Sequence, residues 1–379
     1  MAQVVSSWNE WGRLRRVILG RADGTMVQAP EPAVVRDWPE DGFPRGSWGP
    51  LPQEMVDAAN EQLDGLAALL EKHGVVVDRP EPLDFSRRVS TPDWEQGSMF
   101  GVMPPRDLLL TVGNEILEAT MSQRSRWFEY LAYRPLLERY FKEDPGFRWE
   151  AAPKPKLTDA SYADGMRFWE TAEAMSDEDQ IARFTMNRRW NLTEVEPLFD
   201  AADVGRFGRD LFVQRSTVTN ASGIDWLRRH FPGHRIHEVL FRESHPMHID
   251  ATFVPLRPGL ALSNRVRVPL EERMVRLFAM NDWEIVPCAE PALRPEERPP
   301  MCFCSVWLSM NTLLLDDHTI FVEEREVAQQ EQFSKLGFEV IPVPFWAVAP
   351  FGGGLHCATA DVHRDGGLED YFPEQIPGY

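Results

Sequence analysis

Cys357 follows a run of glycines near the end of the chain. Gly352–Gly354 precede the tripeptide Leu-His-Cys that ends at Cys357, and glycine lets a backbone approach a ligand closely. A phosphate-binding loop would need Lys followed by Ser or Thr after the glycines, and this stretch has neither. A cysteine thiolate is a strong nucleophile. Cys357 is therefore a candidate nucleophile, although a buried and unreactive cysteine is the commoner interpretation of the pattern alone.

His248 and Asp250 form a second candidate pair in the stretch Met247-His248-Ile249-Asp250. If this stretch is a strand, its period of two places His248 and Asp250 on one face and Met247 on the other. Histidine is the most frequent general acid and base in enzymes. The spacing His-x-Asp also offers two ligands of an iron-binding triad, with His318 or His356 as a possible third. The helices expected here count against that alternative, because such sites usually lie in all-β barrels.

Polar residues also stand near the starts of the other predicted hairpins. Asp200 and Asp203 open one hairpin, Asp107 opens another, and Ser305, next to Cys304, stands before a third. Each residue alone is typical of a turn cap. Five such positions with a Cys, a His and two Asp residues among them are not plausibly all structural. The positions are Asp107, Asp200, His248, Ser305 and Cys357.

The elements that position these residues repeat along the chain as strand, turn, strand, helix and strand. Hairpins are predicted at 107–119, 200–214, 248–262 and 307–322, helices at 124–141, 224–231, 270–280 and 327–336, and strands at 147–151, 234–241, 283–287 and 338–343. A fifth hairpin begins at 354–362 and has no helix after it. Its missing parts lie at the start of the chain, as a strand at 14–20, a helix at 53–73 and a strand at 74–77.

Five similar units predict an α/β fold of pseudo-fivefold ββαβ modules closed into a ring, because closure removes exposed strand edges. We expect one domain over residues 1–379, closed by its N- and C-terminal segments. Equivalent positions of a ring converge on its axis, so the polar residues above should form one site. The segments 30–52, 152–191 and 287–300 do not fit the repeat and are predicted to be surface loops, where substrate selection is usually placed.

Composition narrows the class of protein. The 379 residues carry a formal net charge of −19, which argues against binding to nucleic acid or anionic membranes. With 43% hydrophobic residues the chain can build a large core. No apolar run reaches the ~18 residues of a membrane-spanning helix, and the N-terminus does not resemble a secretory leader. The four cysteines are too few for a disulfide scaffold, so a cytoplasmic location is expected.

A thiol, a histidine and several carboxylates together suit a planar cation, because a guanidinium pairs with carboxylates in fork geometry. The attacked atom would then be the guanidinium carbon of an arginine-like molecule. The motifs Gly-Gly-Gly-Leu-His-Cys at Cys357, Pro-Met-His-Ile-Asp-Ala-Thr-Phe at His248 and Phe-Asp-Ala-Ala-Asp at Asp200 resemble the arginine:amine amidinotransferases, which include glycine amidinotransferase and inosamine-phosphate amidinotransferase. Further similar stretches follow in order: Pro105-Arg106-Asp107, Thr111–Glu115, Ala152–Lys156, Gly208–Asp210 and Trp307–Asn311.

This resemblance implies a five-bladed α/β propeller, the pentein fold, commonly as a homodimer and without metal or organic cofactor. It implies that Cys357 is the nucleophile, His248 the general acid and base, and Asp200 its carboxylate partner. The residues expected to contact substrate are Asp107, Asp250, Arg267, Cys304, Ser305, Met247 and Asp203. Among them, Arg267 is expected to take the α-carboxylate of arginine. Cys304 stands where the glycine enzyme has a second serine. A thiol is a poorer hydrogen-bond donor than a hydroxyl, so the affinity for arginine or the choice of acceptor amine can differ.

The reaction implied is transfer of the amidino group from L-arginine to an acceptor amine, with release of ornithine and ping-pong kinetics. The acceptor stays open between glycine, lysine, another amino acid and an amino-sugar. Segment 30–52 and the region of Ser244 and His245 are expected to border its pocket. If water reaches the intermediate, the enzyme is instead a pentein-type hydrolase that releases citrulline. A non-catalytic arginine-binding protein would leave the Cys357 motif unexplained.

Overall fold

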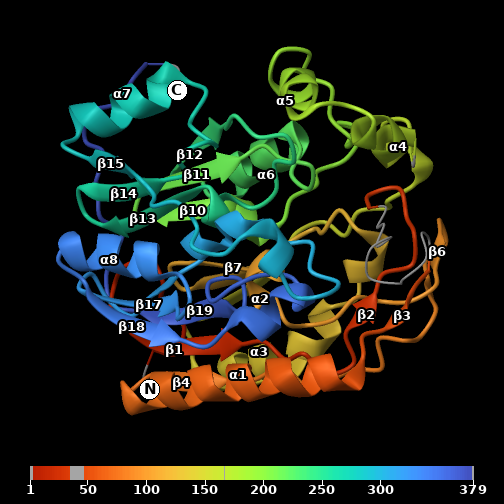
Figure 1. Ribbon diagram of the computed structural model, residues 1–379, viewed down its shortest axis with the longest axis horizontal. Helices are drawn as coiled ribbons and strands as arrows, with labels where there is room; N and C mark the ends of the chain where they lie inside the picture. Colours follow the sequence, from red (N-terminus) through yellow and green to blue (C-terminus); the bar gives the residue numbers. More distant parts are fainter. Residues whose placement is uncertain (1–2, 35–46, 166, 378–379) are drawn as a thin grey trace.

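The computed structural model describes residues 3–34, 47–165 and 167–377, which contain five three-stranded sheets (Figure 1). Their strands are β1 (Leu14–Leu19), β4 (Val76–Asp78), β7 (Leu109–Val112), β8 (Glu115–Glu118), β9 (Arg148–Ala151), β10 (Val204–Phe207), β11 (Asp210–Gln214), β12 (Arg235–Val239), β13 (Phe253–Arg257), β14 (Leu260–Ser263), β15 (Glu284–Pro287), β16 (Leu313–Leu314), β17 (Thr319–Glu323), β18 (Glu339–Val343) and β19 (Thr359–Arg364). The sheet orders are β19-β1-β4, β7-β8-β9, β10-β11-β12, β13-β14-β15 and β16-β17-β18. In every sheet the first pair is antiparallel and the second is parallel.

The first sheet is assembled from both ends of the chain. Strand β1 lies between β19 and β4, and Val17 faces Asp361 on one side and Val77 on the other. The predicted completion of the fifth unit by the terminal segments is therefore confirmed.

A helix links the second and third strands of each sheet, since parallel neighbours need a crossover. The five helices are α1 (Gln53–Lys72), α3 (Tyr130–Glu143), α6 (Ala221–His230), α7 (Glu272–Met280) and α8 (Val327–Lys335). The buried face of α1 begins with Val56 and Ala59 and continues through Leu63. Met55 and Ala58 lie more toward solvent.

Two helices start later than predicted because long-range contacts occupy their first residues. The expected helix from Arg124 is a 3₁₀ turn, η1 (Arg124–Arg126), and α3 begins only at Tyr130. The Glu31 carboxylate accepts a hydrogen bond from the backbone N–H of Ser125 at 3.2 Å. Likewise, the Leu270 N–H donates to the Leu240 carbonyl at 3.0 Å, so α7 starts at Glu272.

Four of the predicted hairpins begin with short helical turns rather than strand, and a fifth turn precedes the hairpin predicted at 354–362. These turns are α2 (Pro105–Leu108), η3 (Ala201–Asp203), η4 (Ile249–Ala251), η6 (Val306–Met310) and η7 (Trp346–Phe351). The strand expected at Met247–Asp250 is therefore wrong: His248 has φ 61° and ψ 116° and precedes η4. Turn α2 contacts η3, η3 contacts η4, and η4 contacts η6. This chain of contacts brings residues from different sheets together.

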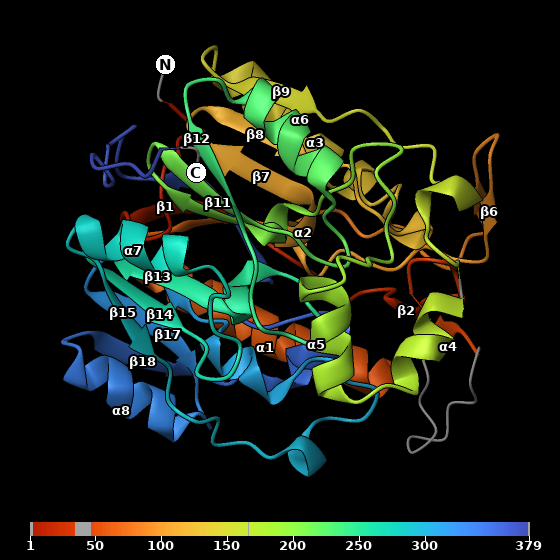
Figure 2. The same cartoon turned by 90° about the horizontal axis from the view of Figure 1, so that it is seen from above.

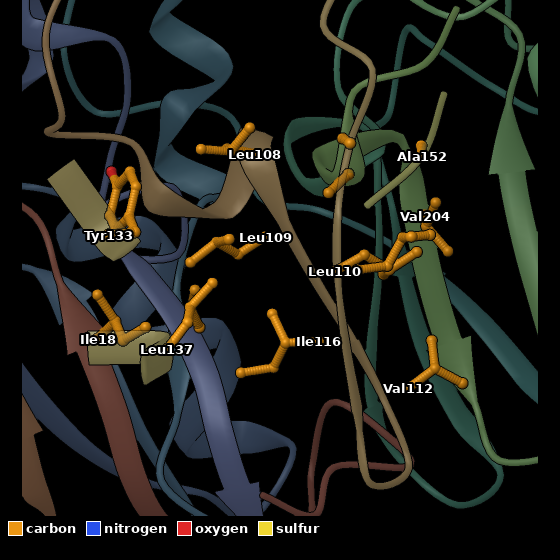
Figure 3. Packing of buried hydrophobic residues seen from close by; sticks show 14 of the residues in the cluster. Ile18, Leu108, Leu109, Leu110, Val112, Ile116, Tyr133, Leu137, Ala152 and Val204 are labelled. Atoms are coloured by element: carbon orange, nitrogen blue, oxygen red, sulfur yellow. The ribbon is translucent and has the colours of Figure 1, made fainter. Parts of the chain in front are cut away.

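Strand β7 lies in the largest apolar cluster of the described residues. Strand β7 is buried along its whole length, so alternate side chains pack in opposite directions. In Figure 3, Leu109 lies on the side of Tyr133 and Leu137, whereas Leu110 lies against Val204 of the next sheet. Because β7 is buried on both faces, its sheet and the β10-β11-β12 sheet share one apolar cluster.

The segments outside the repeat are more ordered than the predicted surface loops. Residues 152–191 contain η2 (Asp159–Ser161), α4 (Arg167–Glu173) and α5 (Asp177–Thr185), and 287–300 contains η5 (Pro295–Glu297). Segment 30–52 holds β3 (Gly49–Pro50), paired with β2 (Met26–Val27), and its residues 35–46 lie outside the described residues. A further hairpin pairs β5 (Val89–Ser90) with β6 (Glu95–Gln96). In Figures 1 and 2, α4, β2 and β6 share one side of the molecule. Within the described chain, every helix is too short or too polar to span a membrane.

Candidate active site

A cavity of about 410 Å³ collects almost all the residues singled out in the sequence. Its lining includes Asp107, Asp200, Met247, His248, Asp250, Arg267, Cys304, Ser305 and Cys357. Most of them lie on or directly beside the short helical turns that precede the first strands of the sheets. Residues as distant in the sequence as Asp107 and Cys357 thus line the same cavity.

Asp203 is the exception, because it lies behind the cavity wall. Its side chain is buried, and its Oδ2 atom accepts hydrogen bonds of 2.6 Å from Ser216 and Thr219. Burial raises the pKa of Asp203 to about 7, although the His248 charge and these hydroxyls oppose the shift. Asp203 therefore supports the site from behind instead of facing the cavity.

Cys357 follows η7 and is only 4% exposed. The Sγ atom lies 3.1 Å from Nδ2 of Asn311 and 3.3 Å from Oδ2 of Asp250. Burial first, and then the charges of Asp250 and Asp107, raise the pKa of this thiol well above its usual value. The sulfur is therefore protonated at neutral pH, and a nearby cation would favour the thiolate.

Gly353 leaves room for the cysteine that follows it. Its φ is 151°, and a Cβ atom there would lie 2.4 Å from Cβ and 2.5 Å from Sγ of Cys357. No side chain fits at such distances, so the glycine run allows the loop to fold over the thiol.

Gly353→Ala is expected to lower the kcat for ornithine release by roughly 100-fold, because displacing a candidate nucleophile such as Cys357 by about 1 Å costs that much. Steady-state kinetics measure the effect, and circular dichroism checks the fold. The matched control is Gly65→Ala on α1, where an added Cβ meets nothing within 4 Å. An unchanged kcat in Gly353→Ala would contradict the steric argument.

His248 is held between two carboxylates. Its Nε2 atom lies 3.2 Å from Asp200 Oδ2, and its Nδ1 atom lies 3.6 Å from Asp107 Oδ1. Burial by itself lowers the pKa of His248, but Asp107, Asp200 and Asp203 outweigh it and raise the pKa to about 10. The imidazole is thus protonated at neutral pH. The positive φ of His248 is a strained conformation of the kind that clusters at functional sites.

Three carboxylate oxygens in this cavity lack a hydrogen-bond donor. Oδ1 of Asp107, Oδ1 of Asp200 and Oδ1 of Asp250 are buried and have no hydrogen-bond partner among the described residues. The other oxygen of each is engaged, for example Asp250 Oδ2 by His356 Nδ1 at 2.8 Å. Burial raises the pKa of Asp250, but this bond together with the charges of His356 and His248 outweighs burial and lowers it. Buried acceptors without donors are costly, so the site is suited to a ligand rich in N–H groups.

Arg267 supplies a positive group elsewhere in the cavity wall. Its Nη1 atom lies 3.0 Å from Oε1 of Glu243, which also lines the cavity. Burial raises the pKa of Glu243 to about 7, although Arg267 opposes the shift. Ser305 caps η6 by accepting the Trp307 N–H at 3.2 Å, and the Cys304 thiol donates to the Ala349 carbonyl at 3.4 Å.

Several lining residues were not predicted. Arg126 pairs with Asp107 at 2.6 Å, and no local pattern indicated this contact. Asn311 ends the stretch Trp307–Asn311, whose likeness to the amidinotransferases could have identified it. The expected border of the acceptor pocket is consistent with the lining, which includes His245, Ala33 and Val34.

Among the described residues, a metal could find ligands in one place. Asp107, Asp200 and His248 offer atoms within 4.8 Å of one another, but Arg126 already neutralises Asp107. The iron triad considered from the sequence is not assembled. His318 is exposed beside Asp317 and is not part of the cavity lining, and both ring nitrogens of His356 are occupied, by Asp250 and by Glu10.

Comparison with known proteins gives relatives that match almost the whole chain. No family model matches. Glycine amidinotransferase, mitochondrial, of Xenopus tropicalis is 41% identical over 372 residues, which cover 97% of this chain and 85% of that protein. The L-arginine:L-lysine amidinotransferase of Pseudomonas savastanoi pv. phaseolicola is 39% identical over 374 residues, which cover 97% of this chain and 96% of that protein.

Solved structures agree with these relatives. An amidinotransferase of the saxitoxin biosynthetic pathway from Microseira wollei superposes with a TM-score of 0.84 at 36% identity, covering 97% of this chain and 99% of that one. The inosamine-phosphate amidinotransferase of Streptomyces griseus gives a TM-score of 0.82 at 37% identity, covering 98% and 100%. The N-terminal domain of a cyanobacterial arginine dihydrolase, at 14% identity and a TM-score of 0.55, shares the fold alone. With its mixed α/β sheets and these relatives, the chain belongs to the amidinotransferase family.

Proposed function

We propose that the protein transfers the amidino group of L-arginine to an acceptor amine through an amidino-cysteine at Cys357 and releases ornithine. The observation that carries the proposal is the set of donor-free oxygens on Asp107, Asp200 and Asp250 beside the Cys357 thiol. A guanidinium brings five N–H donors and a positive charge. It satisfies these acceptors and presents its carbon to the sulfur.

The first half-reaction starts from a neutral thiol and a protonated His248. The bound guanidinium lowers the pKa of the Cys357 thiol. The thiol proton moves to Asp250 Oδ2, which already accepts a hydrogen bond from the S–H group. The thiolate attacks the guanidinium carbon and forms an S–C bond. His248 protonates the departing nitrogen as the C–N bond breaks, and ornithine leaves.

The second half-reaction uses the now neutral His248 as a base. It removes a proton from the acceptor ammonium, the free amine attacks the amidino carbon, and the S–C bond breaks. The attacking nitrogen gives its second proton to the departing thiolate, which restores the Cys357 thiol. The proton that Asp250 took in the first half-reaction is released once the product guanidinium leaves. Asp200, at 3.2 Å from Nε2, keeps the ring oriented in both steps.

The test is product analysis with arginine alone and then with arginine plus a panel of amines, alongside intact-protein mass. We expect ornithine release and an amidino adduct on Cys357 that one class of amine discharges. The relatives named above suggest glycine, lysine and an amino-cyclitol phosphate as first members of the panel. Citrulline formed without any amine would identify a hydrolase and contradict the transferase proposal.

Arg267 is proposed to bind the α-carboxylate of arginine. Arg267→Met is expected to raise the KM for arginine about 10- to 100-fold, the size of a lost charged hydrogen bond. Agmatine, which lacks the carboxylate, should show no such change as a donor. Because Glu243 would be left unpaired, Arg267→Met/Glu243→Gln is the control. Equal losses with arginine and agmatine would contradict the assignment.

We also propose that residues 1–379 form one domain, a closed five-bladed propeller. Contacts between successive sheets support it: β19 meets β7, β7 meets η3, β10 meets β13 and η4 meets η6. The β16-β17-β18 sheet in turn meets the β19-β1-β4 sheet, where the Leu14 N–H donates a hydrogen bond to the Leu315 carbonyl at 2.8 Å. A homodimer is proposed from the family resemblance, to be checked by light scattering. The cytoplasmic location stays a prediction from the few cysteines.

A further inference from the structure

Asn311 reaches the nucleophile from a neighbouring sheet. It caps the C-terminal end of η6, just before β16, whereas Cys357 precedes β19 in a different sheet. Its side chain is buried, with 2% exposure, and lines the cavity. A polar side chain so deeply placed needs hydrogen-bond partners, and its partners are the cysteine and the residue before it.

Three hydrogen bonds join Asn311 to the cysteine loop. The Oδ1 atom accepts the backbone N–H groups of His356 at 2.9 Å and Cys357 at 3.0 Å. The Nδ2 atom lies 3.1 Å from Sγ of Cys357. One side chain thus contacts both the backbone that carries the nucleophile and its reacting atom.

The orientation of this amide is determined by its partners. Two backbone N–H groups can only be met by the oxygen, because the –NH₂ group has no acceptor to offer them. The –NH₂ group must then face the sulfur. Gly354 leaves space for this arrangement, since a Cβ there would come within 2.9 Å of Asn311 Oδ1.

The charges around the sulfur make such a donor necessary. Asp250 Oδ2 lies 3.3 Å away, and its charge opposes ionisation, as does the charge of Asp107. A hydrogen bond with the backbone of Gly354 acts in the opposite direction and lowers the pKa of the thiol. The amide of Asn311 adds an N–H that is aimed at the sulfur and cannot turn away.

We propose that Asn311 is a positioning residue that aligns the Cys357 side chain and stabilises its sulfur as a thiolate during attack on the guanidinium. The proposal rests on the proposed function in assigning attack to Cys357. Its test, however, needs no arginine and no turnover.

The experiment follows alkylation of Cys357 by iodoacetamide against pH, read by mass spectrometry of the peptide that contains it. Asn311→Asp keeps an oxygen for the two backbone N–H groups but turns the second group from donor to acceptor. The apparent pKa of Cys357 should rise by about one unit, and alkylation below that pKa should slow about tenfold. The kcat for ornithine release should fall by more than the KM for arginine changes.

The matched control is Asn9→Asp. Asn9 is also buried, and its Oδ1 accepts the N–H groups of Trp11 and Gly12, but it is not part of the cavity lining. An unshifted profile in folded Asn311→Asp, or an equal shift in Asn9→Asp, overturns the proposal. If Asn311→Asp does not fold, Asn311→Ser decides, because it removes the amide donor without adding charge; an unshifted profile there also overturns it. Failure of the transferase proposal would appear separately, in the product analysis.

Discussion

Replacing Cys357 with alanine is expected to abolish amidino transfer, with kcat falling by about 10⁶-fold, as when a catalytic nucleophile is removed. The sulfur is the atom that would carry the amidino group, and no other cysteine of similar burial lines the cavity among the described residues. Arginine should still bind, because Asp107, Asp200 and Asp250 keep their unpaired oxygens. Ornithine release measures the first effect, and isothermal titration calorimetry measures the second.

Cys288→Ala serves as the matched control for this variant. Cys288 is fully buried in an apolar cluster away from the cavity, so its loss should lower stability by about 1 kcal/mol and leave kcat unchanged. Turnover by Cys357→Ala above roughly one hundredth of the wild-type rate would show that another group carries the amidino moiety. Loss of both turnover and arginine binding would instead indicate a collapsed site.

Replacing His248 with glutamine should lower kcat by about 10²- to 10⁴-fold, the usual range for a general acid and base. Without the imidazolium, the leaving amine has no proton donor, and the facing carboxylates of Asp107 and Asp200 lose their shared cation. Rates of ornithine release with saturating arginine measure the loss. His318→Gln, in an exposed turn, is the control. A kcat within about threefold of wild type would remove His248 from the mechanism.

Asp200→Asn adds a pH signature to the same assignment. The pKa of His248 stands at about 10 because carboxylates outweigh its burial. Ornithine release, which needs the protonated ring, should therefore persist up to about that pH and decline above it. Removing the Asp200 charge lowers the pKa of His248, so the alkaline decline should begin at lower pH. A decline at the same pH in wild type and Asp200→Asn would mean that another group titrates there.

The repeat was predictable because its signals are local. Gly113, Gly208 and Gly259 have φ of 62°, 65° and 81°. Hairpin turns favour glycine at positions with positive φ, so these glycines indicate the turns in the sequence. Alternating and helical periods then located the strands and crossover helices within a few residues. The errors arose where a distant group intervened, as where Glu31 binds Ser125 and delays the start of α3.

The short helical turns under the site could not be read from local pattern. The stretch around His248 alternates polar and apolar residues as a strand does, yet it contains the 3₁₀ turn η4. Its conformation depends on contacts with η3 and η6, which come from other sheets. Arg126 and Glu243 were missed as site residues for the same reason, since each acts on a partner from another segment.

The sequence by itself identified the candidate residues for the chemistry. Cys357, His248 and Asp200 stand in motifs that resemble one enzyme family, and motif identity does not depend on coordinates. Only the tertiary structure decided the protonation of Cys357 and His248 and which carboxylate oxygens of the cavity lack a hydrogen-bond donor. A pKa depends on burial and on charges a few ångströms away, and the groups that set it for Cys357 and His248 come from segments up to about 250 residues distant in the chain. Folding brings those charges together. The carboxylate oxygens of the cavity become buried without hydrogen-bond donors only in the folded protein.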